Sequence, residues 1–263
     1  MTKLGQFSIA SLTLLCLLSV SERSFARAGG GAGAAATGLK SPGPAGLCTG
    51  DTENQRKAWV DKGWCKALFE SVRGKDGGCE RDNFNKLAQK IRSNQINGFK
   101  EWCPQIDSFK RDEDVAMVLT QIVSTLIISE SMWKQNAVGP SLKGRHAQGL
   151  MQLSADSIKS YKCGGCNSGI SDSALKDDAF KSLRCGTYIA LSWMEKDSQV
   201  GGGSGKRSRG IARYFQPFRE IDKQKREVMK KKVANYCETR KGDTSRDRAI
   251  TGGGGSGDNN GSR

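Results

Sequence analysis

Val115-Ala-Met-Val-Leu-Thr-Gln-Ile-Val-Ser-Thr-Leu-Ile-Ile-Ser129, followed directly by Glu130, is the stretch that decides the fold of this chain. Its apolar residues recur at helical spacing with few polar residues between them, so it predicts a buried helix. A carboxylate at the end of such a helix is partly desolvated, and desolvation raises the pKa of a carboxyl group. A general acid working near neutral pH needs such a pKa, so Glu130 is the candidate catalytic residue. A solvated acid at a helix end is the alternative interpretation.

Two short motifs accompany this glutamate. Glu130-Ser131 is followed by the aromatic Trp133, and Gly149-Leu-Met-Gln152 comes about twenty residues later. In this order and at this separation, the motifs resemble the signature of the soluble lytic transglycosylase and goose-type lysozyme superfamily. The resemblance covers about Val115 to Phe218. It implies a mainly α, lysozyme-like catalytic domain that acts on the glycan strands of peptidoglycan.

The resemblance also implies roles for single residues. Glu130 matches the catalytic acid of the family. The segment from Ser182 to Ile189 resembles the family's Asn-x-x-x-Gly-x-x-Tyr-Leu motif, and Ala212-Arg-Tyr-Phe215 resembles its Ala-x-Tyr-Asn motif, whose tyrosine would approach the acid. The substrate-binding residues implied in this way are Ser131, Gly149, Leu150, Met151, Gln152, Tyr188 and Tyr214.

Four positions depart from the family pattern. Ser182 and Phe215 stand where asparagine is expected, and His146 replaces a common glycine. Ser154 follows Leu153, where the motif usually continues toward a proline. The acid, the Gly-Leu-Met-Gln core and the tyrosine are retained, so we expect an active enzyme with an altered glycan preference.

The chemistry implied by the resemblance uses one carboxylate, whereas most glycosidases use two. Glu130 would protonate the oxygen of the MurNAc–GlcNAc β-1,4 bond while the 2-acetamido group of the substrate assists. If Glu130 then deprotonates the 6-hydroxyl of the sugar, the product has a 1,6-anhydromuramyl end. This is lytic transglycosylase chemistry, and we favour it.

Two other functions stay open. A lysozyme-type hydrolase would activate water and leave reducing ends, including on chemically modified glycan such as deacetylated cell wall. Its second carboxylate could come from the acids Asp156, Asp172, Asp177 and Asp178, each of which is otherwise a surface acid or a helix cap. A peptidoglycan-binding protein without activity is the remaining alternative, supported only by the departures at Ser182 and Phe215.

The N-terminal residues predict export. Residues 1–28 have a positive start at Lys3, an apolar core and small residues at a cleavage site, as in a signal peptide. Residues 29–46 form a linker rich in glycine, alanine and proline. Both the apolar core of the signal and the run ending at Ser129 are expected to be too short to span a membrane. We therefore expect a secreted or periplasmic protein with no stable membrane anchor.

The cysteines agree with export. Removal of the signal would leave an even set, namely Cys48, Cys65, Cys79, Cys103, Cys163, Cys166, Cys185 and Cys237. This predicts up to four disulfides, whose connectivity the sequence does not give. The Cys163-Gly-Gly-Cys166 spacing also suits a zinc site, but no second pair follows and His146 is the only histidine of the chain. We therefore expect neither a metal nor a cofactor.

The formal net charge is +15, which raises the possibility of nucleic-acid binding. Much of the excess lies in the C-terminal third, and no aromatic residues alternate with the basic ones to stack on bases. An exported basic protein is better suited to anionic cell-wall glycan with its peptide carboxylates. The expected partner is peptidoglycan rather than nucleic acid, and the protein is expected to be a monomer.

The chain is expected to be mainly α, with at most a small hairpin near the cleft. Residues 47–110 predict a helical N-terminal region stapled by disulfides, and residues 111–240 the lysozyme-like transglycosylase domain. Gly201-Gly-Gly-Ser-Gly205 predicts a flexible surface loop, and residues 241–263 a disordered tail.

Overall fold

The computed structural model describes Cys48 and residues 53–75, 77–142, 145–166, 169–219 and 222–251. The predicted signal peptide, the whole of the predicted linker and residues 252–263 of the predicted C-terminal tail lie outside these residues. The chain divides into two compact units, Met1–Gly38 and Leu39–Arg263, and every described residue belongs to the second unit.

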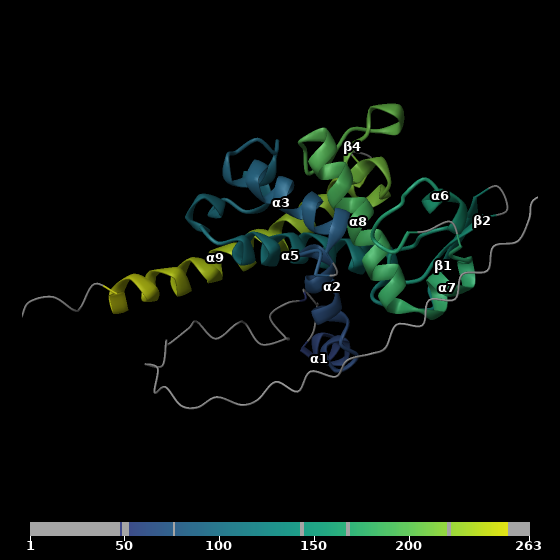
Figure 1. The fold of residues 1–263 in the computed structure, drawn as a ribbon, viewed down its shortest axis with the longest axis horizontal. Helices are drawn as coiled ribbons and strands as arrows, with labels where there is room; N and C mark the ends of the chain where they lie inside the picture. Colours follow the sequence, from purple (N-terminus) through teal and green to yellow (C-terminus); the bar gives the residue numbers. More distant parts are fainter. Residues whose placement is uncertain are drawn as a thin grey trace, which may run out of the picture. The chain divides into compact units, whose positions relative to one another are not determined.

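The described part is mainly α, as predicted, and its elements are shown in Figure 1. Its α-helices are α1 (Glu53–Asp61), α2 (Trp64–Val72), α3 (Gly78–Arg92), α4 (Phe99–Trp102), α5 (Asp112–Ser131), α6 (Ala155–Ile158), α7 (Asp172–Asp177), α8 (Ala179–Asp197) and α9 (Lys223–Thr251). The 3-10 helices are η2 (Ile106–Ser108), η3 (Gly205–Arg207), η4 (Ile211–Arg213) and η5 (Gln216–Phe218), and the strands are β1 (Val138–Leu142), β2 (Arg145–Gln148), β3 (Gly201–Gly202) and β4 (Arg209–Gly210).

Helix α5 is the core of the fold. Acidic residues occupy its first turn, where they are favourable at the positive end of the helix dipole, and Arg111 pairs with Asp114 at 2.8 Å. Every residue from Asp114 to Ile127 is buried, so the helix is enclosed on all sides. It ends at Ser131, and the next residue, Met132, has a left-handed backbone with φ 52°. The predicted buried helix is thus confirmed.

By length and composition, α5 is the one helix among the described residues that could cross a membrane. The expectation that this run is too short was therefore wrong, because the helix begins at Asp112 and gains a turn before the apolar residues. However, 83% of its most apolar window is buried inside the protein. Its apolar surface is already covered by α2, α3 and α9, as in the core helix of a globular domain.

The N-terminal helices share this core. Trp133, just beyond α5, stacks on Trp59 of α1 with ring centroids 4.8 Å apart, and its centroid lies 6.3 Å from that of Trp64 in α2. Helix α8 packs against both α2 and α3. In Figure 1, α3 lies to one side of α8, and the β1–β2 hairpin with α7 lies to the other.

All eight cysteines predicted to pair do so, which confirms the disulfides and supplies their connectivity. The bonds are Cys48–Cys65, Cys79–Cys163, Cys103–Cys237 and Cys166–Cys185. Two of them join the N-terminal helices to later parts of the chain, since Cys79 is in α3 and Cys103 follows α4. The two cysteines of the Cys163–Cys166 motif have different partners, so the short spacing between them reflects neither a zinc site nor a redox pair.

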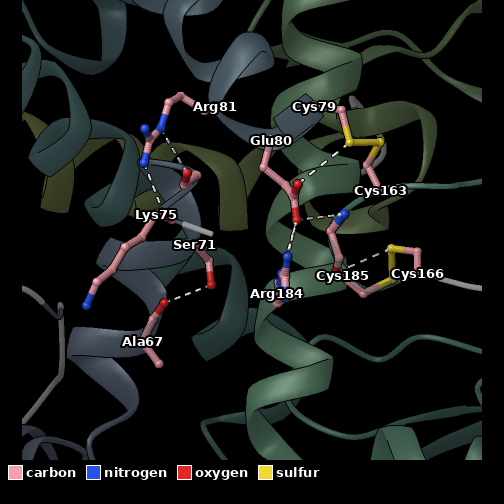
Figure 2. A network of polar contacts seen from close by, with 12 residues as sticks. Ala67, Ser71, Lys75, Cys79, Glu80, Arg81, Cys163, Cys166, Arg184 and Cys185 are labelled. Atoms are coloured by element: carbon pink, nitrogen blue, oxygen red, sulfur yellow. Dashed lines mark hydrogen bonds and ion pairs between the residues drawn. A yellow bond between two sulfur atoms is a disulfide. The ribbon is translucent and has the colours of Figure 1, made fainter. Parts of the chain in front are cut away.

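An ion pair accompanies these bonds. Figure 2 shows Glu80 of α3 between the Cys79–Cys163 bond and Arg184 of α8. The Oε1 atom of Glu80 accepts hydrogen bonds from the Gly164 backbone N–H at 3.1 Å and from Arg184 Nη2 at 2.6 Å. The Glu80 side chain is only 11% exposed, so this pair is better shielded from water than an ordinary surface ion pair. It ties α3, the Cys163–Cys166 loop and α8 together.

The strands form two small antiparallel pairs, β1–β2 and β3–β4. The first is a small hairpin, which the sequence led us to expect. The second uses Gly201 and Gly202, which were expected in a flexible loop. This expectation was wrong because Gly201 lies against Phe218, so close that an added Cβ would come within 2.9 Å of its ring. Helix α9 continues to Thr251, beyond residue 241, where the tail was expected to begin.

Candidate active site

Glu130 lies in the last turn of α5 and is partly buried. Burial raises the pKa of its carboxyl group from 4.5 to about 7, because the ionised form loses its hydration. The positive charges of Lys225 and Arg219 oppose this rise, and the negative charge of Asp222 adds to it. A carboxyl group with this pKa can both donate and accept a proton near neutral pH.

Asp222 is the carboxylate whose negative charge raises the pKa of Glu130. Its Oδ2 atom is buried and has no hydrogen-bond partner among the described residues. The sequence motifs did not single it out, since it lies between η5 and α9 and is brought to Glu130 only by the packing of α9 on α5.

The four acids considered from sequence have other contacts. Asp178 caps α8 by accepting from the Lys181 backbone N–H, and Asp172 accepts from the Ala155 backbone N–H at 2.6 Å. Asp156 pairs with Lys159, and Asp177 lies 4.0 Å from Lys176. These four acids therefore act as hydrogen-bond acceptors for backbone N–H groups or as partners in ion pairs.

Tyr214 follows η4 and lies within electrostatic reach of Glu130. Its hydroxyl is hydrogen-bonded to Ser157 Oγ and to the Ser154 backbone. Burial raises the pKa of Tyr214 to about 12, and the charge of Glu130 contributes to the rise. The phenol therefore stays protonated at all physiological pH values, and its hydrogen bonds to Ser157 and Ser154 fix its position.

An aromatic cluster that the motifs missed extends from this tyrosine through Tyr161 to Trp193. The ring centroids of Tyr161 and Tyr214 are 6.5 Å apart in an edge-to-face arrangement. Trp193 donates its indole N–H to the Tyr161 hydroxyl at 2.6 Å, and Arg213 lies over the Trp193 ring at 4.6 Å. Burial raises the pKa of Tyr161. These half-buried rings form an amphipathic wall, of the kind against which sugars can pack.

The Gly149–Gln152 loop packs against α7 and α8. Gly149 has φ 73°, and an added Cβ would meet the Leu175 carbonyl at 2.1 Å, so only glycine fits. Leu150 and Met151 are completely buried, and the Met151 N–H donates to Ser182 Oγ at 3.1 Å. These two residues therefore support the loop rather than face solvent, and their predicted contact with glycan stays a prediction.

Gln152 is the partly exposed member of this loop. Its Nε2 donates to the Ala137 carbonyl at 3.1 Å and to the Gly149 carbonyl at 2.9 Å, which links the loop to the β1–β2 hairpin. Its backbone is left-handed, with φ 48°, an uncommon conformation for a residue with a side chain. The amide is therefore held in one orientation.

Ser131 and Tyr188 are placed differently from what the motif implies. The Ser131 hydroxyl donates to the Ile127 carbonyl at 3.2 Å, back along its own helix. Tyr188 packs on Gly164, where an added Cβ would come within 2.2 Å of the tyrosine Cβ. The motif has two residues between its glycine and tyrosine, and that spacing falls on Ile189, which is fully buried. Tyr188 lies one residue earlier.

The departures from the family pattern have structural explanations. Ser182 is fully buried and supplies the acceptor for Met151. Phe215 is 2% exposed and packs on Tyr214 with ring centroids 4.8 Å apart. His146 is exposed, and its Nδ1 lies 3.0 Å from the Gly139 carbonyl. Ser182 and Phe215 thus stabilise the core around the site, and neither opens a new contact surface.

The chain was compared with protein families, curated proteins and solved structures. The model of the transglycosylase SLT domain matches residues 107–236. No curated protein matches the chain. Among solved structures, a mutant of Bd0314 DslA is 22% identical with a TM-score of 0.47, covering 65% of this chain and 91% of its own. Its wild-type form 2 is 24% identical with a TM-score of 0.43, covering 65% and 90% respectively.

Proposed function

We propose that this protein is a lytic transglycosylase acting through Glu130. Residues 107–236 match the transglycosylase SLT domain, the domain of a family of peptidoglycan enzymes that cleave glycosidic bonds. The bond cleaved is the β-1,4 bond between MurNAc and GlcNAc. The observation that carries the proposal is the pKa of Glu130, raised by burial to about 7. Neither a metal nor a cofactor takes part.

Glu130 acts first as an acid. A carboxyl group with a pKa of about 7 holds its proton in a large fraction of molecules at neutral pH, so it can protonate the glycosidic oxygen. The 2-acetamido oxygen of the muramyl residue attacks the anomeric carbon as the bond to the leaving sugar breaks. Glu130, now ionised, then removes the proton of the 6-hydroxyl, whose oxygen displaces the acetamido group. The product is a 1,6-anhydromuramyl end, and Glu130 regains its proton.

Other residues support this chemistry. The Tyr214 hydroxyl stays protonated and directs a dipole into the site, where it stabilises charge that develops at the sugar. Gln152 contributes its amide oxygen, because its amide nitrogen is already used within the loop. Lys225 and Arg219 stabilise the ionised form of Glu130 in the second step.

A lysozyme-type hydrolase is the second candidate, and Asp222 favours it. Its buried Oδ2 has no partner among the described residues and its charge reaches Glu130, so it could hold a water molecule for attack on the anomeric carbon. A hydrolase of this kind would not need the acetamido group. It should therefore also cut deacetylated sacculi, whereas the transglycosylase should not.

Product analysis of Asp222→Asn separates the two candidates. If Asp222 activates water, the variant loses the formation of reducing ends. If the protein is a transglycosylase, the variant keeps its anhydro products on native sacculi. A binding protein without activity would give no soluble product with either chain.

Four disulfides and a peptidoglycan-acting domain are consistent with a location outside the cytoplasm. We propose export to the periplasm or the medium, with the enzyme acting as a monomer on the wall.

A further inference from the structure

A small polar pocket lies where α9 packs against α4, beside the strand β3. Its volume is about 270 Å³, just below the usual range of ligand pockets, so it suits a small ligand. None of the residues assigned to the chemistry at Glu130 lines it, and the proposed mechanism leaves it without a role. The lining residues that matter here are Glu101 of α4, Gln199, Gly202 of β3, and Arg226 and Lys230 of α9.

The guanidinium group of Arg226 supplies a charge that no neighbouring acid balances. Its Nε atom is buried and has no hydrogen-bond partner among the described residues. Within the same part of the chain, Arg226 also forms no ion pair, whereas Lys230, one turn later on α9, does. A donor on a charged group is costly to bury without an acceptor, so this nitrogen indicates where an acceptor binds.

The other charges of the pocket are already paired. Lys230 pairs with Glu101, and its Nζ also lies 3.3 Å from Glu227 Oε1. Lys230 therefore adds no free positive charge, and the Glu101 carboxylate repels a second negative charge on a ligand. The pocket thus suits an anion that carries one negative charge.

Gly202 leaves space between two side-chain donors. A Cβ added to this glycine would lie 3.2 Å from Gln199 Nε2 and 3.7 Å from Arg226 Nη1, so the two nitrogens flank the same point. The Gln199 amide makes only a long hydrogen bond of 3.4 Å to the Gly201 carbonyl. Because Gly202 has no side chain, an anion can approach its backbone closely and accept from both nitrogens.

We propose that this pocket binds a small carboxylate, which links α9 to residues 199–202. The carboxylate oxygens accept from the Arg226 guanidinium and from Gln199 Nε2. A guanidinium matches the planar geometry of a carboxylate, and charge-assisted hydrogen bonds of this kind are stronger than neutral ones. A phosphate dianion is less suited, because its second charge faces Glu101. The inference goes beyond the proposed function, since this binding site shares no residue with the one at Glu130.

Calorimetric titration of the full chain with glycolate, at neutral pH and constant ionic strength, tests the proposal. Glycolamide is the control ligand, because it has nearly the same shape without the charge. Arg226→Gln removes the guanidinium, and Gln199→Leu removes the second donor. Arg207→Gln is the matched control for the loss of an arginine, since Arg207 is exposed and lies outside the pocket.

We expect the parent to bind glycolate saturably, with a Kd on the order of 1 mM for so small a ligand. Binding should weaken at least ~10-fold in Arg226→Gln and roughly 3-fold in Gln199→Leu, and it should be unchanged in Arg207→Gln. Glycolamide should not bind. No saturable binding to the parent, or equal binding of glycolamide, would overturn the proposal. So would inorganic phosphate that binds more tightly than glycolate.

An NMR titration of the isotope-labelled parent keeps the test decisive if Arg226→Gln does not fold. Glycolate should shift one arginine Nε–H signal, and the shift should saturate with the calorimetric Kd. Arg226→Lys keeps the charge but lacks the Nε donor, so it identifies this signal by its loss. If no arginine Nε–H signal shifted, the assigned site would be wrong even with glycolate bound. Neither measurement uses activity, so failure of the proposed function leaves both results valid.

Discussion

Replacing Glu130 by glutamine is expected to stabilise the folded protein at alkaline pH. Burial raises the pKa of this carboxyl group from 4.5 to about 7. Between these pH values the folded protein holds a proton that the unfolded chain releases, so the stability of the parent falls as pH rises through this window. Below pH 4.5 both states are protonated and there is no loss. Glutamine has the same shape and stays uncharged, so the variant avoids the loss.

The size of the effect follows from the two values. A rise from 4.5 to about 7 corresponds to a loss of about 3 kcal/mol above pH 7, at about 1.4 kcal/mol for each tenfold change in the protonation equilibrium. Partial exposure of Glu130 reduces this, so we expect a gain of about 2–3 kcal/mol in the free energy of unfolding for the variant.

Urea unfolding followed by tryptophan fluorescence, with the disulfides intact, measures this gain at pH 4 and pH 8.5. The two proteins should be equally stable at pH 4, and Glu130→Gln should be more stable at pH 8.5. Glu113→Gln is the matched control on the same helix, and it should gain nothing because an acid in the first turn favours the helix dipole. If Glu130→Gln were no more stable than the parent at pH 8.5, Glu130 would not be desolvated and the argument would fail.

Three further predictions concern the site and its scaffold. Lys225→Gln should move the alkaline limb of the kcat/KM profile to higher pH, and Asp222→Asn to lower pH, because the two charges act in opposite directions on Glu130; shifts of the same sign would refute this. Tyr214→Phe should reduce kcat about 10–100-fold with unchanged stability, whereas a silent Tyr214→Phe beside a crippling Tyr188→Phe would show the wrong tyrosine at the site. The Cys103–Cys237 bond joins residues 134 apart in sequence, and the Cys48–Cys65 bond joins residues 17 apart. Replacing both cysteines of a bond by serine should therefore lower the free energy of unfolding by about 5 kcal/mol for the first bond and about 3 kcal/mol for the second, because closing the longer loop removes more entropy from the unfolded chain. Equal losses in denaturant titrations would contradict this.

The sequence predicted those features that depend on local pattern. The periodicity from Val115 to Ser129 predicted a buried helix, and the desolvation of Glu130 follows directly from its position at the end of that helix. The glycine at position 149 was also recognisable, since no other residue tolerates its backbone conformation and its contact with Leu175.

Features that depend on packing between distant segments were not predictable. Leu150 and Met151 belong to a motif associated with the cleft, but both are completely buried, and Met151 packs against Gly186 of α8. Lys225 and Asp222 reach Glu130 only because α9 packs along α5. The one signal that could have found them is the apolar spacing of Met229 and Val233 within a basic segment, which indicates a helix with one buried face. The disulfide connectivity likewise requires the fold.

Mass analysis of the soluble products from purified sacculi tests the central claim most directly, with the parent protein and Glu130→Gln compared at equal concentration. We predict that the parent releases fragments with 1,6-anhydromuramyl ends, which are lighter by one water molecule than reducing-end fragments. Glu130→Gln should release none while it still binds the sacculi. Release of fragments by Glu130→Gln at a rate within a few-fold of the parent would contradict the claim that Glu130 is the catalytic acid.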